Sequence, residues 1–140
     1  MKKFEFVDIT TSDVAFISYG RNLNELFENS ALAMFEVMVD TKNVKPVVSR
    51  KVSVKGNDMQ SLMFSWLNSL LLYVDSESLV FSKFIAEVDG EKFFLRAECF
   101  GEKINPKSHE LKTSVKSPTY HKMEIKKEKG FWKARVILDI

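Results

Sequence analysis

Two aspartates and the last residue of the chain are the groups best suited to chemistry in this sequence. Asp13 lies where a polar turn leads into a predicted strand, and Asp139 lies at the end of the final strand, directly before Ile140. Hard cations such as Ca²⁺ and Mg²⁺ take oxygen ligands from carboxylates, backbone carbonyls and water. The two side chains and the backbone carboxylate of Ile140 could therefore form one metal site. The same spacing also fits two aspartates that are exposed and unrelated, since aspartate is usually found on the surface.

The final segment explains why these groups would be held in place. From Trp132 to Ile140 apolar residues occupy every second position, and Lys133, Arg135 and Asp139 occupy positions between them. This alternation is typical of a strand with one buried face. Chain ends usually fray, so a strand that continues to the last residue predicts an ordered end, with Asp139 fixed beside the terminal carboxylate.

Other reactive side chains lack the partners that catalysis requires. No glycine-rich phosphate loop, HExxH, CxxC or nucleophile-elbow motif is present. Cys99 shares a strand face with apolar residues, so we interpret it as part of the core. His109 lies in a polar loop, where we expect it to be solvated. His121 lies in a predicted strand, where a hydrogen-bonded structural role is favoured over a catalytic one.

Charge is nearly balanced over the whole chain, with 21 basic and 19 acidic residues and a formal net charge of +2. This balance gives no general reason to expect strong direct binding to nucleic acid. Six basic residues surround the last predicted hairpin: Lys122, Lys126, Lys127, Lys129, Lys133 and Arg135. Such a run is most often a solvated face, and the neighbouring Phe131 and Trp132 modestly favour a surface that binds a partner.

Length and composition favour one compact domain over residues 1–140. We also expect a location in the cytoplasm. The 140 residues are 45% apolar, which is enough for one core, and the single cysteine excludes an intramolecular disulfide. The N-terminus becomes acidic too early for a signal peptide. The most apolar run, residues 62–74, is too short to cross a bilayer, so we expect no membrane contact.

Two segments have the periodicity of amphipathic helices. Asn22 precedes the first, which ends near Asp40, and Asp58 precedes the second; both residues are typical helix caps. Apolar side chains recur in each at i, i+3, i+4 and i+7. The second helix, which contains Trp66, is apolar around most of its circumference, so we expect it to be the central buried helix.

The remaining segments alternate as strands. They are predicted at residues 4–7, 14–19, 47–54, 79–88, 92–100, 118–127 and 131–140. Asp89-Gly90 and Lys129-Gly130 are expected to be hairpin turns. The resulting order, ββαβαββββ, predicts an α+β fold in which two helices pack against a mostly antiparallel β-sheet.

Several short motifs follow one another along nearly the whole chain. They are Thr11-Ser12-Asp13-Val14, Ala31-Leu32-Ala33-Met34-Phe35, Trp66-Leu67-Asn68, Leu79-Val80-Phe81-Ser82, Gly101-Glu102-Lys103, His109-Glu110, Val115-Lys116, Thr119-Tyr120-His121 and Asp139-Ile140. In this order they resemble the archease family of proteins, which assist the GTP-dependent 3′-phosphate RNA-splicing ligase. Their order and the terminal Asp-Ile carry the resemblance together, since no single motif is decisive.

The resemblance implies a metal site and an accessory function. In archeases the aspartate of the first turn and the C-terminal aspartate and isoleucine bind a divalent cation, which implies Asp13, Asp139 and Ile140 as ligands here. The implied ion is Ca²⁺, with Mg²⁺ or Mn²⁺ as alternatives. No catalytic residue is implied, so the protein would not be an enzyme. Lys116 and His121 are candidates for binding the partner protein.

The implied function is activation of the RNA-splicing ligase in tRNA splicing, by promoting guanylylation of a ligase histidine and multiple turnover. One alternative is a chaperone-like modulator of a tRNA cytosine methyltransferase, which also has precedent in the family. Another is a metal-dependent phosphohydrolase that would use the two aspartates with His109 or His121 as the base.

Two positions depart from the family pattern. Ile9-Thr10 stands where archeases usually have Asp-His, and Ser69 stands where they often have Glu. If the missing histidine tunes the metal site or contacts the ligase, that role changes in this chain.

Overall fold

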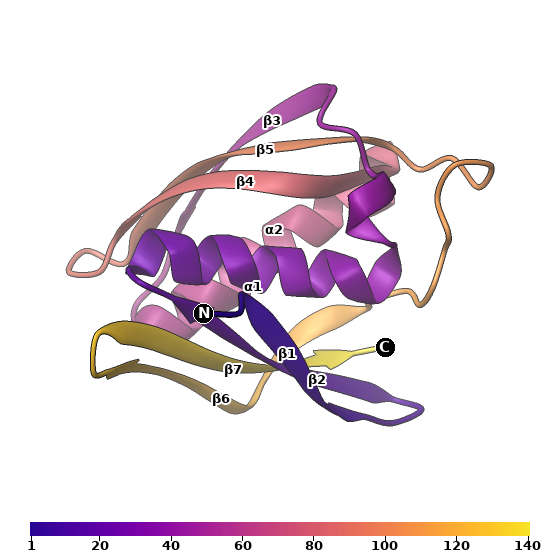
Figure 1. Ribbon diagram of the computed structural model, residues 1–140. Coiled ribbons are helices and arrows are strands. Elements are labelled where there is room, and N and C mark those ends of the chain that lie inside the picture. The colour runs from indigo at the N-terminus through magenta and orange to yellow at the C-terminus, as the bar shows by residue number, and fades with distance from the viewer.

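Two antiparallel sheets enclose two helices in this fold (Figure 1). The computed structural model describes all 140 residues, and its elements follow the predicted order ββαβαββββ. The first sheet contains, in order across the sheet, β1 (Phe4–Ile9), β2 (Asp13–Gly20), β7 (Phe131–Asp139) and β6 (Ser117–Glu128). The second contains β3 (Val48–Lys55), β5 (Phe94–Lys103) and β4 (Leu79–Asp89). Every pairing is antiparallel, which confirms the α+β class, with the strands divided between two sheets.

The helices α1 (Leu23–Met38) and α2 (Met59–Glu77) lie between the sheets (Figure 1). α1 packs mainly on β4 and β2, whereas α2 packs mainly on β6 and β3. A short 3₁₀ turn, Thr41–Asn43, follows α1. No helix here has both the length and the hydropathy that crossing a bilayer requires. Each sheet therefore buries one face against the same pair of helices.

Local hydrogen bonds start both helices where the sequence predicts. The Asn22 side chain accepts a hydrogen bond from the Glu25 backbone N–H at 2.9 Å. Asp58 accepts from the Ser61 N–H at 2.7 Å, and the Ser61 hydroxyl oxygen accepts from the Asp58 N–H at 3.1 Å. The second arrangement is a complete capping box, which satisfies two helix-end donors reciprocally.

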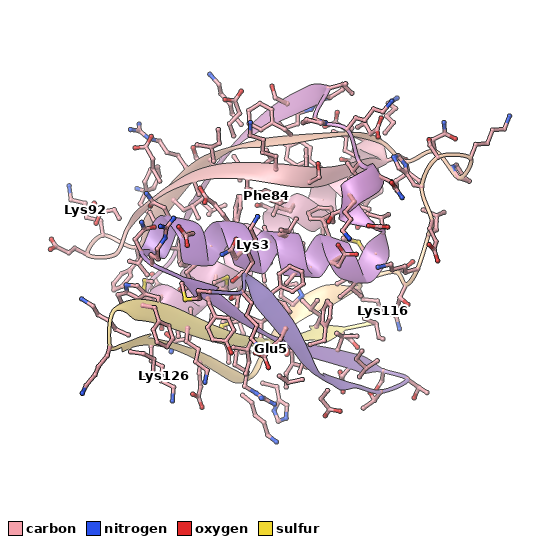
Figure 2. The ribbon with its side chains drawn as sticks, viewed as in Figure 1. Lys3, Glu5, Phe84, Lys92, Lys116 and Lys126 are labelled. Atoms are coloured by element: carbon pink, nitrogen blue, oxygen red, sulfur yellow. The ribbon has the colours of Figure 1, made fainter.

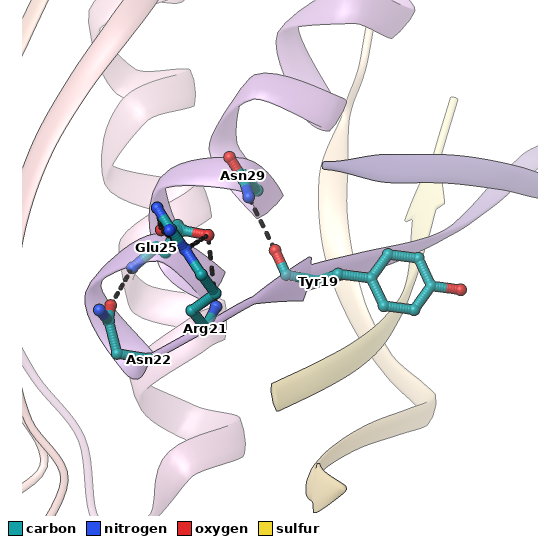
Figure 3. A network of polar contacts seen from close by, with 5 residues as sticks. All are labelled: Tyr19, Arg21, Asn22, Glu25 and Asn29. Atoms are coloured by element: carbon teal, nitrogen blue, oxygen red, sulfur yellow. Dashed lines mark hydrogen bonds and ion pairs between the residues drawn. The ribbon is translucent and has the colours of Figure 1, made fainter. Parts of the chain in front are cut away.

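The junction between β2 and α1 is fastened by a polar network (Figure 3). The Asn29 amide nitrogen donates to the Tyr19 carbonyl at 2.7 Å, which ties the helix to the end of the strand. One turn earlier the Arg21 guanidinium pairs with Glu25 at 3.1 Å, and this contact lowers the pKa of the Glu25 carboxyl. The network sets the direction in which α1 leaves β2.

Side chains of α1 also cover the free edge of β4. The Glu28 carboxylate accepts from the Ala86 N–H at 2.8 Å, and the Asn24 side-chain oxygen accepts from the Val88 N–H at 2.8 Å. Burial raises the pKa of the Glu28 carboxyl. Edge strands otherwise present unpaired N–H groups to other chains, so α1 takes the place of a further strand here.

α2 is the buried helix that its composition predicts. Trp66 is fully buried, and its indole N–H donates to the Phe27 carbonyl of α1 at 2.8 Å. The indole also packs edge-on against Phe84 of β4, with ring centroids 6.0 Å apart. Cys99 is fully buried in the same core, and burial raises the pKa of its thiol to about 12. Its interpretation as a core residue is confirmed.

The hairpin turn at Asp89-Gly90 lies further along the chain than predicted, because residues 90–93 connect β4 to β5. β4 continues to Asp89, whose carboxylate accepts from the N–H groups of Glu91 and Lys92, both at 3.0 Å. The left-handed backbone conformation lies at Phe93 (φ 54°) and not at Gly90. In the last hairpin Gly130 has φ 78°, which confirms the predicted turn.

Replacing Trp66 with Ala should lower the free energy of unfolding by about 3–5 kcal/mol, because it removes a fully buried aromatic side chain and leaves a cavity. Urea denaturation measures this loss. Trp66→Phe is the matched control, since it retains an aromatic ring while giving up the indole hydrogen bond, and its loss should be smaller. A loss below about 1 kcal/mol for the alanine variant is typical of a surface position and would contradict the packing described.

Candidate functional site

The pairing of β2 with β7 places Asp13 directly opposite Asp139. This is the first of eight consecutive pairs, which continue without a register shift to Gly20 and Trp132. Directly opposed residues on antiparallel strands have Cβ atoms about 4.5–5.5 Å apart and side chains on the same face. The structure therefore brings together the two carboxylates that the sequence singled out, although they are far apart in the chain.

Backbone hydrogen bonds hold the last residues beside this pair. The Ile140 N–H donates to the Ser12 carbonyl at 2.9 Å, and the Lys116 N–H donates to the Asp139 carbonyl at 2.8 Å. On its other side Asp139 is paired with Ser117 of β6. Asp139 is thus fixed between two strands, and Ile140 is attached to the turn that carries Asp13. We call the group Asp13, Asp139 and Ile140 the aspartate edge.

The turn before Asp13 is organised by the hydroxyl of Thr10. This oxygen accepts from the N–H groups of Ser12 at 3.2 Å and Asp13 at 3.0 Å. The Thr10 N–H in turn donates to the Asp13 carbonyl at 2.8 Å. Thr10 belongs to the Ile9-Thr10 pair at which the sequence departs from the motifs that carry the resemblance. In this chain its side chain shapes the turn that presents Asp13.

The aspartate edge is a set of oxygen donors without a basic partner. Asp13 is exposed and Asp139 half-buried, and none of the seven ion pairs involves Asp13, Asp139 or Ile140. No group of three or more His, Cys, Asp or Glu side chains is placed to hold a metal ion. A metal here would therefore depend on two side-chain carboxylates together with backbone and hydroxyl oxygens. Such a donor set suits a hard cation such as Ca²⁺ or Mg²⁺ and not a soft one.

His109 is buried, and the expectation that it is solvated is wrong. Its ring is bonded on both sides: Nε2 lies 2.8 Å from a Glu102 carboxylate oxygen, and Nδ1 accepts from the Asn105 N–H at 2.9 Å. Glu102 also accepts from the Lys45 N–H at 2.8 Å. The Lys45 N–H and the His109 ring together lower the pKa of the Glu102 carboxyl. His109 therefore fastens the loop between β5 and β6.

His121 is exposed, and no hydrogen bond joins its side chain to the rest of the chain, so its predicted structural role is wrong. The reason is a shift in register between Thr119 and Glu124 of β6, which lifts the intervening residues out of the ladder. The alternation that would put His121 on the same strand face as Met123 and Ile125 does not continue through this segment. Lys116, the other predicted partner-binding residue, is exposed beside the aspartate edge, where its backbone contacts Asp139.

Comparison with known proteins places this chain in a family. The model of the Archease protein family matches residues 4–140. This chain belongs to the archease family. Protein archease of Sulfurisphaera tokodaii is 44% identical over 140 residues, with all of both chains covered.

Two solved structures extend the likeness to the fold. The solution structure of a Methanobacterium thermoautotrophicum protein is 46% identical and superposes with a TM-score of 0.85, with all of both chains covered. The crystal structure of a Thermotoga maritima archease, described as a possible chaperone, is 17% identical and has a TM-score of 0.68 over 94% of this chain and 93% of that one. At that identity the second likeness shows a shared fold.

Replacing Glu102 with Gln should destabilise this archease at neutral pH but progressively less in acid. A carboxyl whose pKa is lowered in the folded state contributes stability above its unfolded pKa of about 4.5, and that contribution is lost as the pH falls through the folded value. Urea denaturation from pH 7 to pH 3 measures the difference between the variant and the native chain. Glu110→Gln, an exposed site in the same loop, is the control. A Glu102→Gln difference that stays constant over this range would mean that the hydrogen bonds from Lys45 and His109 do not stabilise the charged carboxylate.

Proposed function

We propose that this archease activates the GTP-dependent 3′-phosphate RNA-splicing ligase and is not itself the catalyst. It would promote guanylylation of the ligase histidine, so that each ligase molecule completes many turnovers. The observation that carries the proposal is the direct pairing of Asp13 with Asp139, the two aspartates that the archease resemblance implies as metal ligands. Family membership over residues 4–140 supports it.

The aspartate edge is, in this proposal, the divalent-cation site. The carboxylates of Asp13 and Asp139 and the carboxyl group of Ile140 would hold the ion, with the Ser12 hydroxyl as a further nearby oxygen. Ca²⁺ is the first candidate, with Mg²⁺ or Mn²⁺ as alternatives. When bound, such a cation neutralises the carboxylates and offers positive charge to phosphate oxygens of a partner or its nucleotide.

The chain itself contributes a rigid frame for these oxygens. The β2–β7 ladder sets the separation of the two aspartates, and the Ile140–Ser12 hydrogen bond holds the last residue beside them. The ligands then lose little conformational freedom when the ion binds, and such preorganisation increases the affinity of a site. Lys116 is exposed beside Asp139, and we propose that it contacts an anionic group of the ligase when the edge docks there.

A chaperone-like function toward a tRNA cytosine methyltransferase is the second candidate. It is favoured by the description of the T. maritima relative as a possible chaperone. A pull-down with the tagged archease that recovers the methyltransferase and not the ligase would favour this second candidate. The phosphohydrolase alternative loses one of its two candidate bases, because His109 is buried and bonded to Glu102.

Extending the chain beyond Ile140 should reduce ligase activation at least about tenfold while leaving the fold intact. An added residue converts the Ile140 carboxylate into a neutral amide carbonyl, and the number of charged ligands is a principal control on affinity for Ca²⁺-like ions. The buried face of β7 stays as it is, so thermal melts without added metal should nearly coincide. Multiple-turnover ligation by purified ligase, with and without the variant, measures activation.

Asp13→Ala should behave like the extension, and the two changes together should be less than additive because they affect one site. Asp8→Ala is the matched control, since Asp8 is an exposed aspartate on the neighbouring strand β1. It should leave activation unchanged. Full activation by the extended protein would mean that the end of β7 is only a well-packed strand.

A further inference from the structure

Strand β6 leaves its ladder close to the aspartate edge. Thr119 is opposite Ile137, and the next pair joins Glu124 to Arg135, so β6 advances five residues while β7 advances two. Bulges of this kind redirect side chains and are common beside functional sites. The three extra residues therefore form a projection that the strand pairing alone does not require.

The projection presents Tyr120, His121 and Lys122, all of which are exposed. Lys122 has φ 51°, a left-handed conformation that is unfavourable for residues other than glycine. Residues in such conformations persist where the surrounding structure holds them, and they cluster at binding sites. Met123, the next residue, is buried in the core, so the bulge is a fixed feature that leaves His121 and Lys122 on the surface.

Tyr120 is an immobilised aromatic ring with a free side. It stacks on Phe64 of α2 with ring centroids 4.6 Å apart and planes 7° apart. Its side chain remains on the surface, and the residue is 54% exposed. A ring that is held from one side and open on the other is the kind of platform on which an unpaired nucleobase stacks.

Positive charge is concentrated on the same hairpin. Residues 116–135 contain seven basic and two acidic residues, so the other 120 residues contain 14 basic and 17 acidic ones. One of the two acids, Glu124, is already paired with Lys126 at 3.0 Å. Lys126 projects from the β6–β7 end of the first sheet, away from Lys92 at the turn of the second sheet (Figure 2). The net charge of the whole chain is therefore small although the β6–β7 hairpin is strongly basic.

We propose that the free edge of β6 binds single-stranded RNA, with Tyr120 on the side that faces α2 and with Lys126, Lys133 and Arg135 on the outer face of the sheet. An unpaired base stacks on Tyr120, and the lysines contact the phosphates. An acidic protein would use the charge but would have no need for an open stacked ring, so the combination favours a nucleic acid with unpaired bases. The inference goes beyond ligase activation, because it concerns binding by this chain alone.

The position of this surface connects it to the aspartate edge. Ser117, the partner of Asp139, lies three residues before Tyr120, which is about 10 Å along a strand. Tyr120 therefore lies near the aspartate edge, whereas Lys126 and Lys133 lie further along the ladder, toward the turn of the hairpin. RNA binding differs from the expectation drawn from net charge, because net charge carries no information on how charges are distributed.

The test is fluorescence anisotropy of a labelled oligouridylate of about 12 nucleotides with the full chain, over a range of salt concentrations. Replacing Lys126, Lys133 and Arg135 together with Gln should weaken binding at least about tenfold and reduce the slope of log K against log salt by about 2, since each phosphate contact on a single strand contributes about 0.7. Tyr120→Leu should weaken binding about tenfold without changing that slope. Tyr120→Phe should bind as the native chain does.

The matched control replaces Lys51, Lys55 and Lys92 of the second sheet with Gln, which removes the same charge and should leave binding unchanged. Thermal melts of every variant identify any loss of folding, and Tyr120→Phe separates stacking from the hydroxyl. No binding at low salt would overturn the proposal. So would equal binding of a duplex of the same length, whose bases are already stacked, or equal competition by polyglutamate, which would mean that charge alone is recognised.

Discussion

Strands β2 and β7 pair at the centre of the first sheet and join an early strand to the last one over eight consecutive residue pairs. Along these strands Phe16, Ser18, Ala134 and Val136 are fully buried beneath the helices. A slip of one residue would turn this buried set toward solvent, so the core dictates the register. The same register puts Asp13 opposite Asp139, and hydrophobic packing thereby determines the geometry of a polar site.

The loop between β5 and β6 connects the second sheet to that site. At its start Glu102 links the buried His109 ring to the Lys45 backbone through hydrogen bonds. Further along, the Lys112 N–H donates to the Met38 carbonyl at the end of α1, and the Lys112 ammonium pairs with Glu36. Its last contact is the Lys116 N–H on the Asp139 carbonyl. A long segment without regular structure is thus attached at its start, middle and end, and it supports Asp139 from the side of β6.

Much of this arrangement could be predicted from the sequence because its causes are local. The polar side chains of Asn22 and Asp58 cap their helices through contacts within four residues, and period-two alternation identifies β7. The remainder depends on contacts between distant segments. His109 is buried because Glu102 and Asn105 fold back on it, and neither its neighbours nor its loop composition indicates this. Strand alternation favours a structural role for His121, but a bulge interrupts the pattern and leaves the residue exposed. The division into two sheets likewise depends on which distant strands pair with one another on each side of the helices.

The sequence predicts the candidate ligands of the aspartate edge but not their proximity. Composition and spacing suggested that Asp13 and Asp139 were suitable ligands, but only the family resemblance linked them, since two distant aspartates have no sequence signal for proximity. The pairing of β2 with β7 supplies the physical reason for that proximity. The exposed ring of Tyr120 was not expected, because its stacking on Phe64 joins residues 56 positions apart on a strand and a helix.

If the aspartate edge holds a divalent cation, calorimetric titration of Ca²⁺ into the native chain should detect it. One ion should bind per chain, with Mg²⁺ and Mn²⁺ as competitors. Asp13→Asn and Asp139→Asn should each weaken binding at least about tenfold by removing one charged ligand, with Asp8→Asn unchanged. A native chain that binds none of the three ions, or aspartate variants that bind as tightly as the native chain, would mean that the aspartate edge is not a cation site.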